Sequence, residues 1–169
     1  AGLGQVRYPT AGNAFSEEEA QPFYVNAPFG IVMVHNGNLT NAQSLRSELF
    51  LTDHRHTNTD SDSEVLLNVF AHELDLATRG AVLRTENIFA AVRAVHQRVR
   101  GSYAVVALIA GHGLVAFRDP HGIRPLGMAR GADGAVMVGS ESGALEGIGH
   151  VFERDIAPGE AVFVTLDGQ

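Results

Sequence analysis

The sequence predicts an α+β domain in which helices and strands form separate layers. Three segments with helical periodicity lie between residues 40 and 99, and hairpin strands follow from residue 102 onward. Such blocks favour a layered α+β domain over a parallel doubly wound sheet, in which strands and helices alternate strictly. A length of 169 residues with 45% hydrophobic and 18% charged residues fits one compact unit with a sizeable core.

Two strands are expected near the start of the chain. Residues 5–8 favour a short strand that Pro9 closes, and a polar loop follows it. The β-branched run 31–34 favours a buried strand. The polar pair Asn36 and Gly37 is expected to break this strand, which would place an amide side chain and an exposed backbone N–H at a strand end. That geometry suits a carbonyl oxygen or an oxyanion.

Three helices follow, and each is predicted from a start signal or an apolar period. Thr40, with an amide three residues later, has the spacing of a capping box, so the first helix should begin there and end near Phe50. Residues 61–64 repeat that spacing, and the second helix should run to about Asp75. The third helix is expected over 85–99, where apolar residues share one face.

The rest of the chain is predicted to form strands, one short helix and turns. The strands are expected over 102–110, 114–117, 126–130, 135–139 and 160–166, and the short helix over 142–148. Residues 118–122 have Pro and Gly placed as a turn requires. The residues of that turn do not indicate a chemical role for it.

The charge and the composition exclude several classes of function. Nineteen acidic and twelve basic residues give a net charge of -7 without a Lys/Arg run, which argues against nucleic acid or an anionic membrane surface as the main partner. No apolar stretch reaches the roughly 18 residues that span a bilayer, and no signal pattern is visible, so a cytoplasmic protein is expected. The absence of cysteine excludes disulfides, thiolate metal sites and a cysteine nucleophile within this chain.

Other catalytic and binding patterns are weak. His54 and His56 lie close to Asp60 and Asp62, but their position in a polar connector favours a solvated loop over a metal site. No phosphate-binding glycine motif follows a strand, and no serine lies in a nucleophile elbow. We therefore expect no metal in this chain.

One set of residues could hold a free amino acid. Arg7 at a strand end could bind a carboxylate through two hydrogen bonds, and Asp62 in the first turn of a helix could bind an ammonium group. Asn36 and Gly37 would then face the side-chain carbonyl of that amino acid. Taken alone, the residues favour a plainer alternative, in which Asp62 is a helix-start residue and Arg7 forms a surface ion pair.

A resemblance to a known family changes that balance. Five motifs occur in this order: QVRYPTAG at 5–12, AQPFY at 20–24, HNGNLTN at 35–41, SDSE at 61–64 and RDPHGIRPL at 118–126. Shorter matches are GSYA at 101–104 and APGE at 157–160. Together they closely resemble the class II, Ntn-type glutaminase domain of the amidophosphoribosyltransferase (glutamine phosphoribosylpyrophosphate amidotransferase) family. The resemblance covers nearly the whole chain.

The resemblance implies an Ntn-hydrolase-type four-layer α-β-β-α sandwich whose nucleophile is an amino-terminal cysteine. In that family the residue matching Arg7 binds the α-carboxylate of glutamine, and the residue matching Thr10 lies beside it. The residue matching Asp62 binds the α-amino group, and those matching Asn36 and Gly37 form the oxyanion hole. The thiolate attacks the amide carbon, ammonia leaves, and the glutamyl thioester is hydrolysed.

The resemblance also implies partners that this sequence does not contain. Ammonia passes to a phosphoribosyltransferase domain, where it displaces pyrophosphate from phosphoribosyl pyrophosphate to give 5-phosphoribosylamine in purine synthesis. Mg²⁺ is expected only in that domain, with no cofactor in this chain. The full enzyme is expected to be a homo-oligomer.

Residues 1–169 are expected to be a partial glutaminase domain, because the chain begins without Met and almost at once with strand-like residues. The segment that holds the cysteine and the phosphoribosyltransferase domain are expected to be absent. The sandwich would then be incomplete, with an unpaired edge or apolar face, and this chain inactive alone. Two alternatives stay open: a glutamine-binding or scaffolding relic that never had a nucleophile, and a sibling class II glutaminase such as that of asparagine synthetase.

Overall fold

The computed structural model describes residues 1–6 and 19–166. Its elements follow in the order β1 (Phe23–Val25), β2 (Ile31–Leu39), α1 (Ala42–Leu51), α2 (Asp62–Thr78), α3 (Thr85–Arg98), β3 (Gly101–Ile109), β4 (Gly113–Arg118), β5 (Gly127–Arg130), β6 (Val136–Gly139), α4 (Ser142–Glu146), β7 (Val151–Asp155) and β8 (Ala161–Thr165). The predicted helices and the predicted strands from residue 102 onward are confirmed, whereas β1 and β7 were not predicted. The strand predicted over 5–8 lies partly outside the described residues, and Gln5 and Val6 are not in a strand.

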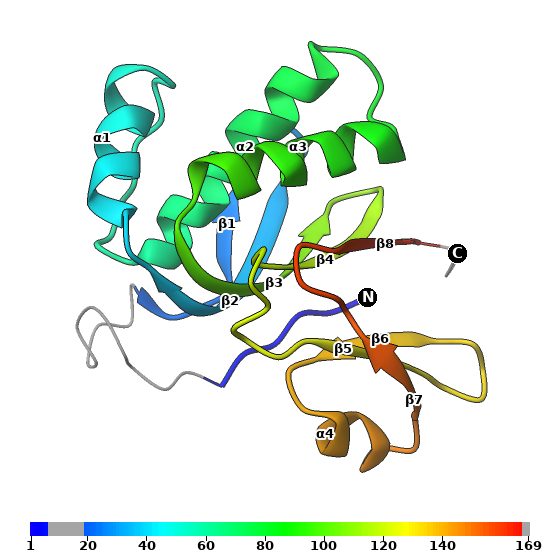
Figure 1. The fold of residues 1–169 in the computed structure, drawn as a ribbon. Coiled ribbons are helices and arrows are strands. Elements are labelled where there is room, and N and C mark those ends of the chain that lie inside the picture. Colours follow the sequence, from blue (N-terminus) through cyan, green and yellow to red (C-terminus); the bar gives the residue numbers. More distant parts are fainter. Residues whose placement is uncertain (7–18, 167–169) are drawn as a thin grey trace.

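The larger sheet carries the main core of the molecule. Its five strands follow the order β1-β2-β3-β4-β8, and all neighbours are antiparallel. Helices α1, α2 and α3 cover one face of this sheet (Figure 1). Apolar side chains from the sheet and the helices pack together there, and the largest fully buried ones include Leu66, Phe70, Ile88, Tyr103 and Phe117.

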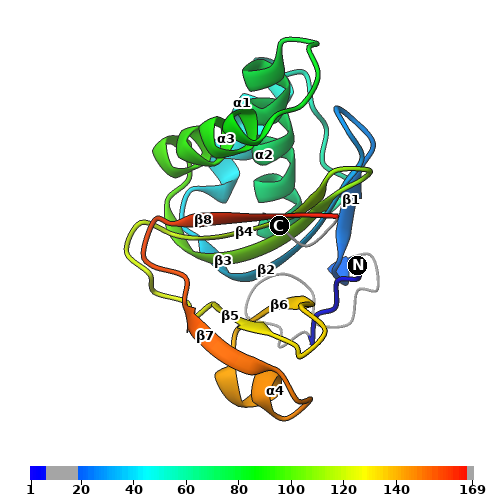
Figure 2. The same cartoon turned by 90° about the vertical axis from the view of Figure 1, so that its right-hand side faces the viewer.

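A smaller sheet lies against the opposite face of the larger one. Its strand order is β6-β5-β7, again antiparallel, and helix α4 packs beyond it. Figure 2 shows the resulting order of layers, which is helices, sheet, sheet and helix. The two sheets meet through an apolar cluster made of Val34, Ala104, Val106, Ala116, Leu126 and Ile156. The architecture is therefore α+β with the α-β-β-α layering that the motifs implied.

Strand β2 differs from its prediction. Asn36 and Gly37 were expected to break the strand, but β2 continues through both residues to Leu39. Strand β3 pairs with β2 over this whole length, with Ala104 opposite Asn36 and Tyr103 opposite Gly37. The prediction was wrong because the pairing with a strand that is distant in sequence outweighs the local turn preference.

The start of helix α1 also differs from its prediction. The helix begins at Ala42 rather than Thr40, and its N-cap Asn41 accepts no capping hydrogen bond, so the predicted capping box is wrong. The Asn41 amide instead donates to the Arg98 carbonyl and accepts from the Arg100 N–H, both at 2.9 Å. This amide joins the start of α1 to the connection between α3 and β3, and a local cap is not formed.

Helix α2 begins where its capping motif indicates. The Ser61 hydroxyl oxygen accepts from the Ser63 N–H at 3.3 Å, and the helix continues past the predicted end to Thr78. Glu64 does not complete the capping box. Its carboxylate accepts the backbone N–H groups of Asn58 and Thr59 at 2.8 and 2.7 Å, and so fixes the preceding connector to the start of α2.

The turn at residues 118–122 ties the two sheets together. The fully buried Asp119 carboxylate accepts the N–H of Tyr103 in β3 and further N–H groups of its own turn. The Arg118 guanidinium donates to three carbonyl oxygens, those of Gly122, Arg124 and Ile156. The last of these follows β7, so the turn holds the smaller sheet against the larger one.

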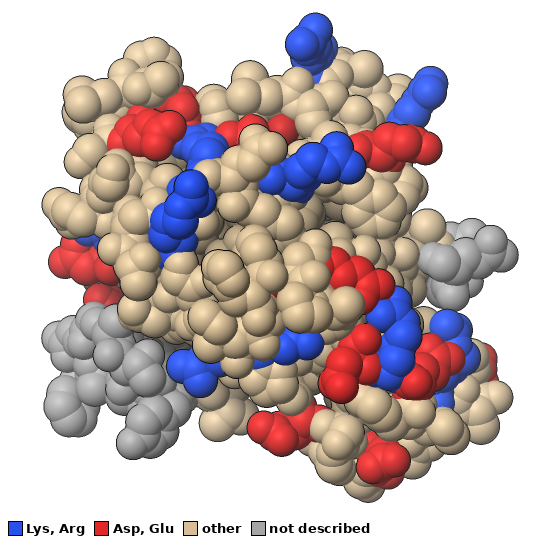
Figure 3. All heavy atoms as spheres, in the orientation of Figure 1, with Lys and Arg blue, Asp and Glu red and all other residues tan. Residues whose placement is uncertain are grey.

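Basic and acidic side chains are intermixed on the face of the molecule that Figure 3 shows. Exposed ion pairs join Arg130 in β5 to Glu153 in β7, and Arg154 in β7 to Glu160 before β8. In the part of the chain that the structure describes, no helix is long and apolar enough to cross a membrane.

Candidate active site

Among residues 1–6 and 19–166, no strand pairs with one edge of β2 at Asn36 and Gly37. Tyr103, which is opposite Gly37, uses its backbone N–H and C=O for Asp119 on the β4 side. Because backbone groups alternate in direction along an antiparallel strand, Gly37 and Tyr103 form a pair that exchanges no hydrogen bonds. The Gly37 N–H therefore faces the other edge of β2. Along that edge, the pairing of β1 with β2 extends only as far as Phe23 opposite Met33.

The positions on either side of Gly37 along this edge are occupied. Gln21 binds both backbone groups of His35, and the Asp62 carboxylate accepts the N–H of Leu39 at 2.9 Å. Among residues 1–6 and 19–166, no hydrogen bond engages the Gly37 N–H or the side-chain amide of the exposed Asn36. Two donors are thus available side by side, between groups that are fixed.

Gly37 cannot be replaced without moving its surroundings. A Cβ atom at this position would lie 2.0 Å from the Ser102 carbonyl oxygen and 2.7 Å from His35 Nε2, and the backbone φ angle is +154°. Those neighbours are a strand backbone and a buried ring, and neither can retreat easily. The site therefore requires glycine, and glycine leaves its own N–H unshielded.

His35 supports this edge from the helix side of the sheet. Its side chain is buried, and its Nδ1 lies 2.9 Å from the Ser63 hydroxyl oxygen at the start of α2. Burial lowers the pKa of His35 below the usual value, and the opposing effects of the Asp62 charge and the Ser102 carbonyl are smaller. The ring is therefore neutral near pH 7, and it contributes packing and a hydrogen bond rather than a charge.

Asp62 provides a negative charge next to the two free donors. It is the first residue of α2, it is half-buried, and its Oδ2 holds the Leu39 N–H. The positive end of the helix dipole favours a carboxylate at that position. The structure brings Asn36, Gly37 and Asp62 to one edge, whereas Arg7 and Thr10 lie outside the described residues, and the roles of all five stay predictions.

Sequence reasoning did not find the role of Gln21. It belongs to the AQPFY motif, but no function was assigned to it. Its amide lies 2.6 Å from His35 N and 3.0 Å from His35 O, two residues beyond the last pair of β1 with β2. The signal that could have found it is the register: once Phe23 is known to pair with Met33, Gln21 must lie opposite His35.

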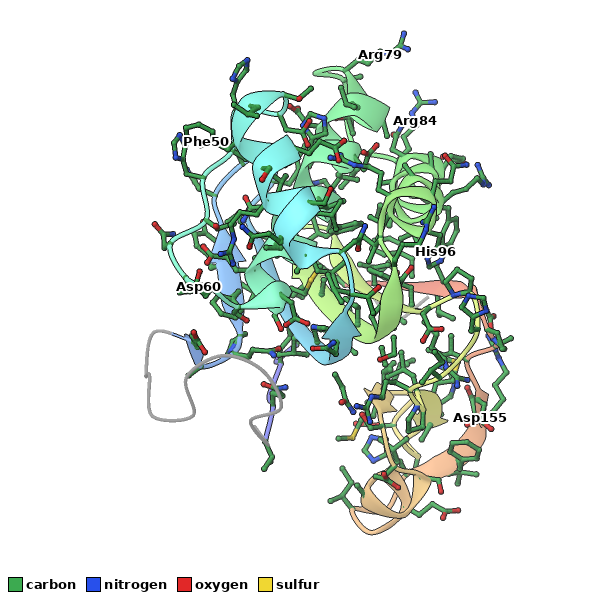
Figure 4. All side chains as sticks on the ribbon, turned by 60° about the vertical axis from the view of Figure 1, so that its left-hand side comes forward. Phe50, Asp60, Arg79, Arg84, His96 and Asp155 are labelled. Atoms are coloured by element: carbon green, nitrogen blue, oxygen red, sulfur yellow. The ribbon has the colours of Figure 1, made fainter. Side chains whose placement is uncertain are left out.

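Other parts of the surface lie apart from this edge. No group of three or more His, Cys, Asp or Glu side chains in the described residues is arranged to hold a metal ion, including those around His54 and His56. Asp60 points outward from the connector before α2 (Figure 4). A hollow of about 340 Å³ lies beside Phe50, and one of about 330 Å³ lies beside His96, but neither includes a residue of β2.

Comparison with known families and proteins gives consistent matches over nearly the whole chain. Residues 13–147 match a family model described as a glutamine amidotransferase domain. The amidophosphoribosyltransferase of Escherichia coli is 58% identical over 172 residues, covering 99% of this chain and 34% of that protein. The enzymes of the same name from Pseudomonas aeruginosa and Schizosaccharomyces pombe are 57% and 51% identical, over 99% and 96% of this chain and 34% and 31% of those proteins. The chain spans about a third of the length of these relatives.

Solved structures agree with these sequence matches. The glutamine phosphoribosylpyrophosphate (PRPP) amidotransferase from B. subtilis, complexed with ADP and GMP, has a TM-score of 0.76 and 27% identity, over 97% of this chain and 32% of that one. A structure described as the allosteric regulatory enzyme of purine biosynthesis has a TM-score of 0.77 and 28% identity, over 97% and 33%.

Proposed function

The chain belongs to the glutamine amidotransferase domain family, and we propose that it forms the glutamine-binding and oxyanion-hole part of an amidophosphoribosyltransferase. Relatives at 58% and 57% identity carry that name. In this proposal, ammonia from glutamine is used in a separate phosphoribosyltransferase domain with Mg²⁺ to make 5-phosphoribosylamine. The full enzyme is proposed to be a homo-oligomer.

The observation that carries the proposal is a pair of donors near Asp62, the Gly37 N–H and the Asn36 amide, which have no partner in the part of the chain that the structure describes. The side-chain carbonyl of glutamine would accept hydrogen bonds from the Gly37 N–H and the Asn36 amide. As a nucleophile attacks the amide carbon, negative charge develops on that oxygen, and donors that are already in place stabilise it without reorganisation. Asp62 would bind the α-ammonium group, while Arg7 and Thr10 are proposed to hold the α-carboxylate.

The reaction also needs a nucleophile. The family resemblance assigns this role to a cysteine, and the 169 residues contain none. In the proposed reaction the cysteine thiolate attacks, ammonia departs, and water hydrolyses the glutamyl thioester. The test therefore uses the full-length gene product that contains this chain.

The first test replaces Asp62 with asparagine in the full-length protein. The amide oxygen can still accept the Leu39 N–H, so the edge of β2 is preserved, but the charge that would bind ammonium is lost. We expect the KM for glutamine to rise about 10- to 150-fold, which corresponds to about 1.5–3 kcal/mol for a charge-assisted hydrogen bond. Synthesis from added ammonia should not change.

The control for this test is Asp60→Asn. Asp60 lies in the connector just before α2, where its highly exposed carboxylate pairs with Arg46. It should leave both activities unchanged. Asn36→Ala should lower glutaminase kcat about a hundredfold or more, since one oxyanion donor is removed. A normal KM in Asp62→Asn would remove Asp62 from the site, and a full-length protein without glutaminase activity would favour the relic over the enzyme.

A further inference from the structure

The side chain of Gln21 takes the place of a missing strand residue. If the register of β1 and β2 continued for two more residues, the backbone of residue 21 would lie opposite His35. Instead, Gln21 Oε1 accepts from His35 N at 2.6 Å, and Gln21 Nε2 donates to His35 O at 3.0 Å. These are the two hydrogen bonds that a neighbouring strand residue would exchange with His35. One side-chain amide therefore extends the ladder beyond the end of β1.

The same amide is anchored to the start of helix α2. Gln21 Nε2 also lies 3.0 Å from the Ser63 hydroxyl oxygen, which is in turn 2.9 Å from His35 Nδ1. His35 and Ser63 are both buried. A closed ring of contacts thus runs from Gln21 to the backbone of His35, through its imidazole, to Ser63 and back. A second amide, that of Gln5, reaches the same His35 carbonyl at 3.0 Å.

This ring fixes the strand just before the two free donors. His35 is joined to Asn36 by a peptide bond, and Gly37 presents its N–H to the same edge as His35. Asp62 fixes that edge on the far side of Gly37 through the N–H of Leu39. The direction of the Gly37 N–H is therefore set by hydrogen bonds on each side of it, those of Gln21 with His35 and that of Asp62 with Leu39. Donors for an oxyanion are effective only when they are held in place before the charge develops.

We propose that Gln21 is a positioning residue of the oxyanion hole, which holds the β2 edge so that Asn36 and Gly37 meet the developing charge. This inference rests on the proposed glutaminase function. Gln21 does not touch the substrate in this arrangement. Its loss should affect the transition state, where the oxygen is charged, more than the binding of neutral glutamine amide.

The test is Gln21→Ala in the full-length protein, with glutamine-dependent and ammonia-dependent activities measured separately. We expect glutaminase kcat to fall about tenfold or more, with the KM for glutamine and the ammonia-dependent rate within about twofold of wild type. This pattern is the opposite of that expected for Asp62→Asn, which raises KM. General loss of folding would lower both activities together.

The matched control is Asn87→Ala. Asn87 also uses one side-chain amide to bridge two backbone groups, accepting from Arg84 N at 3.0 Å and donating to Ala77 O at 2.8 Å, at the junction of α2 and α3. It should leave glutaminase kcat unchanged. If Gln21→Ala does not fold, Gln21→Glu keeps the side-chain length and the acceptor for the His35 N–H but loses the donor to the His35 carbonyl. It should lower kcat about two- to tenfold while KM stays normal, and an unchanged kcat would overturn the positioning role.

The outcomes separate the two proposals. The positioning role alone is overturned if the wild-type protein has glutaminase activity and Gln21→Ala has a normal kcat. It is also overturned if kcat falls by the same factor in Gln21→Ala and Asn87→Ala. A fall in kcat accompanied by an equal rise in KM also overturns it. Absence of glutaminase activity in the wild-type full-length protein overturns the proposed function, and the inference that rests on it fails with it.

Discussion

Replacing Gly37 with alanine should destabilise the fold through a steric clash. The energetic cost of this clash can be measured separately from the cost of backbone strain. The new Cβ would lie 2.0 Å from the Ser102 carbonyl oxygen, 2.7 Å from its carbonyl carbon and 2.7 Å from His35 Nε2. Strand β3 must then move away from β2, where the two are paired from Ile31 to Leu39. Overpacking of this kind costs about 1–3 kcal/mol. An alanine at φ +154° adds backbone strain of about 1–3 kcal/mol.

The assay is urea unfolding of the 169-residue chain, followed by circular dichroism. We expect Gly37→Ala to lower the free energy of unfolding by about 2–6 kcal/mol, a large part of the roughly 5–15 kcal/mol typical of a domain. Gly111→Ala is the matched control, because Gly111 has φ +76° and no atom within 4 Å of the place that a Cβ would take, so it carries strain without a clash. The difference between the two variants measures the contact. Equal losses would refute the close approach of β3 at Gly37.

Two further predictions concern buried charge and protonation. Arg98→Met should lower the free energy of unfolding in urea by about 3–5 kcal/mol, because Arg98 lies 2.8 Å from the buried Asp53 carboxylate and its removal leaves that charge without its main partner. The control Arg130→Met removes an exposed ion pair and should cost about 0–1 kcal/mol. Equal losses in the two variants would contradict the greater cost of the buried pair. Burial lowers the pKa of both His35 and His96 in the folded chain. As the pH falls through about 6.5, the unfolded chain therefore binds protons that the folded chain does not. The free energy of unfolding should accordingly decrease from about pH 7.5 to about pH 5.5. His96→Asn should shrink that decrease, and an unchanged decrease would remove His96 from the explanation.

The helices could be predicted from the sequence because their signals are local. Ile88, Ala91, Val92 and Val95 of α3 repeat with the helical period, and all four are buried. The start of α2 is encoded by Ser61, whose hydroxyl acts within the same turn. The prediction of the start of α1 was wrong for the opposite reason, because the interaction there is not local. Asn41, just after the predicted start at Thr40, uses its amide to bind the connection between α3 and β3, and such a long-range partner cannot be inferred from adjacent residues.

The candidate site could be predicted in its residues but not in its geometry. The chemistry of Asn36, Gly37 and Asp62 offered them as one possible set, and the family resemblance then favoured that set. The structure adds that Asp62 reaches the same edge through Leu39 N. The expected break of the strand at Asn36 was wrong. Within the described residues, the donors have no partner because β2 continues past the last pair with β1 and no other strand covers that edge. Gln21 was missed because its role depends on where β1 ends, which no local pattern indicates.

The buried turn that the sequence left without a role explains why the Gly37 N–H faces away from β3. Asp119 accepts the Tyr103 N–H through its carboxylate and donates its own backbone N–H to the Tyr103 carbonyl at 2.8 Å. Both backbone polar groups of Tyr103 are therefore directed toward the β4 side, away from Gly37. With the backbone of β3 fixed in this orientation, alternation along β2 directs the N–H groups of His35, Gly37 and Leu39 to the opposite edge. Gln21 and Asp62 occupy the first and the last of these, and the remaining one is the donor that the proposed reaction uses.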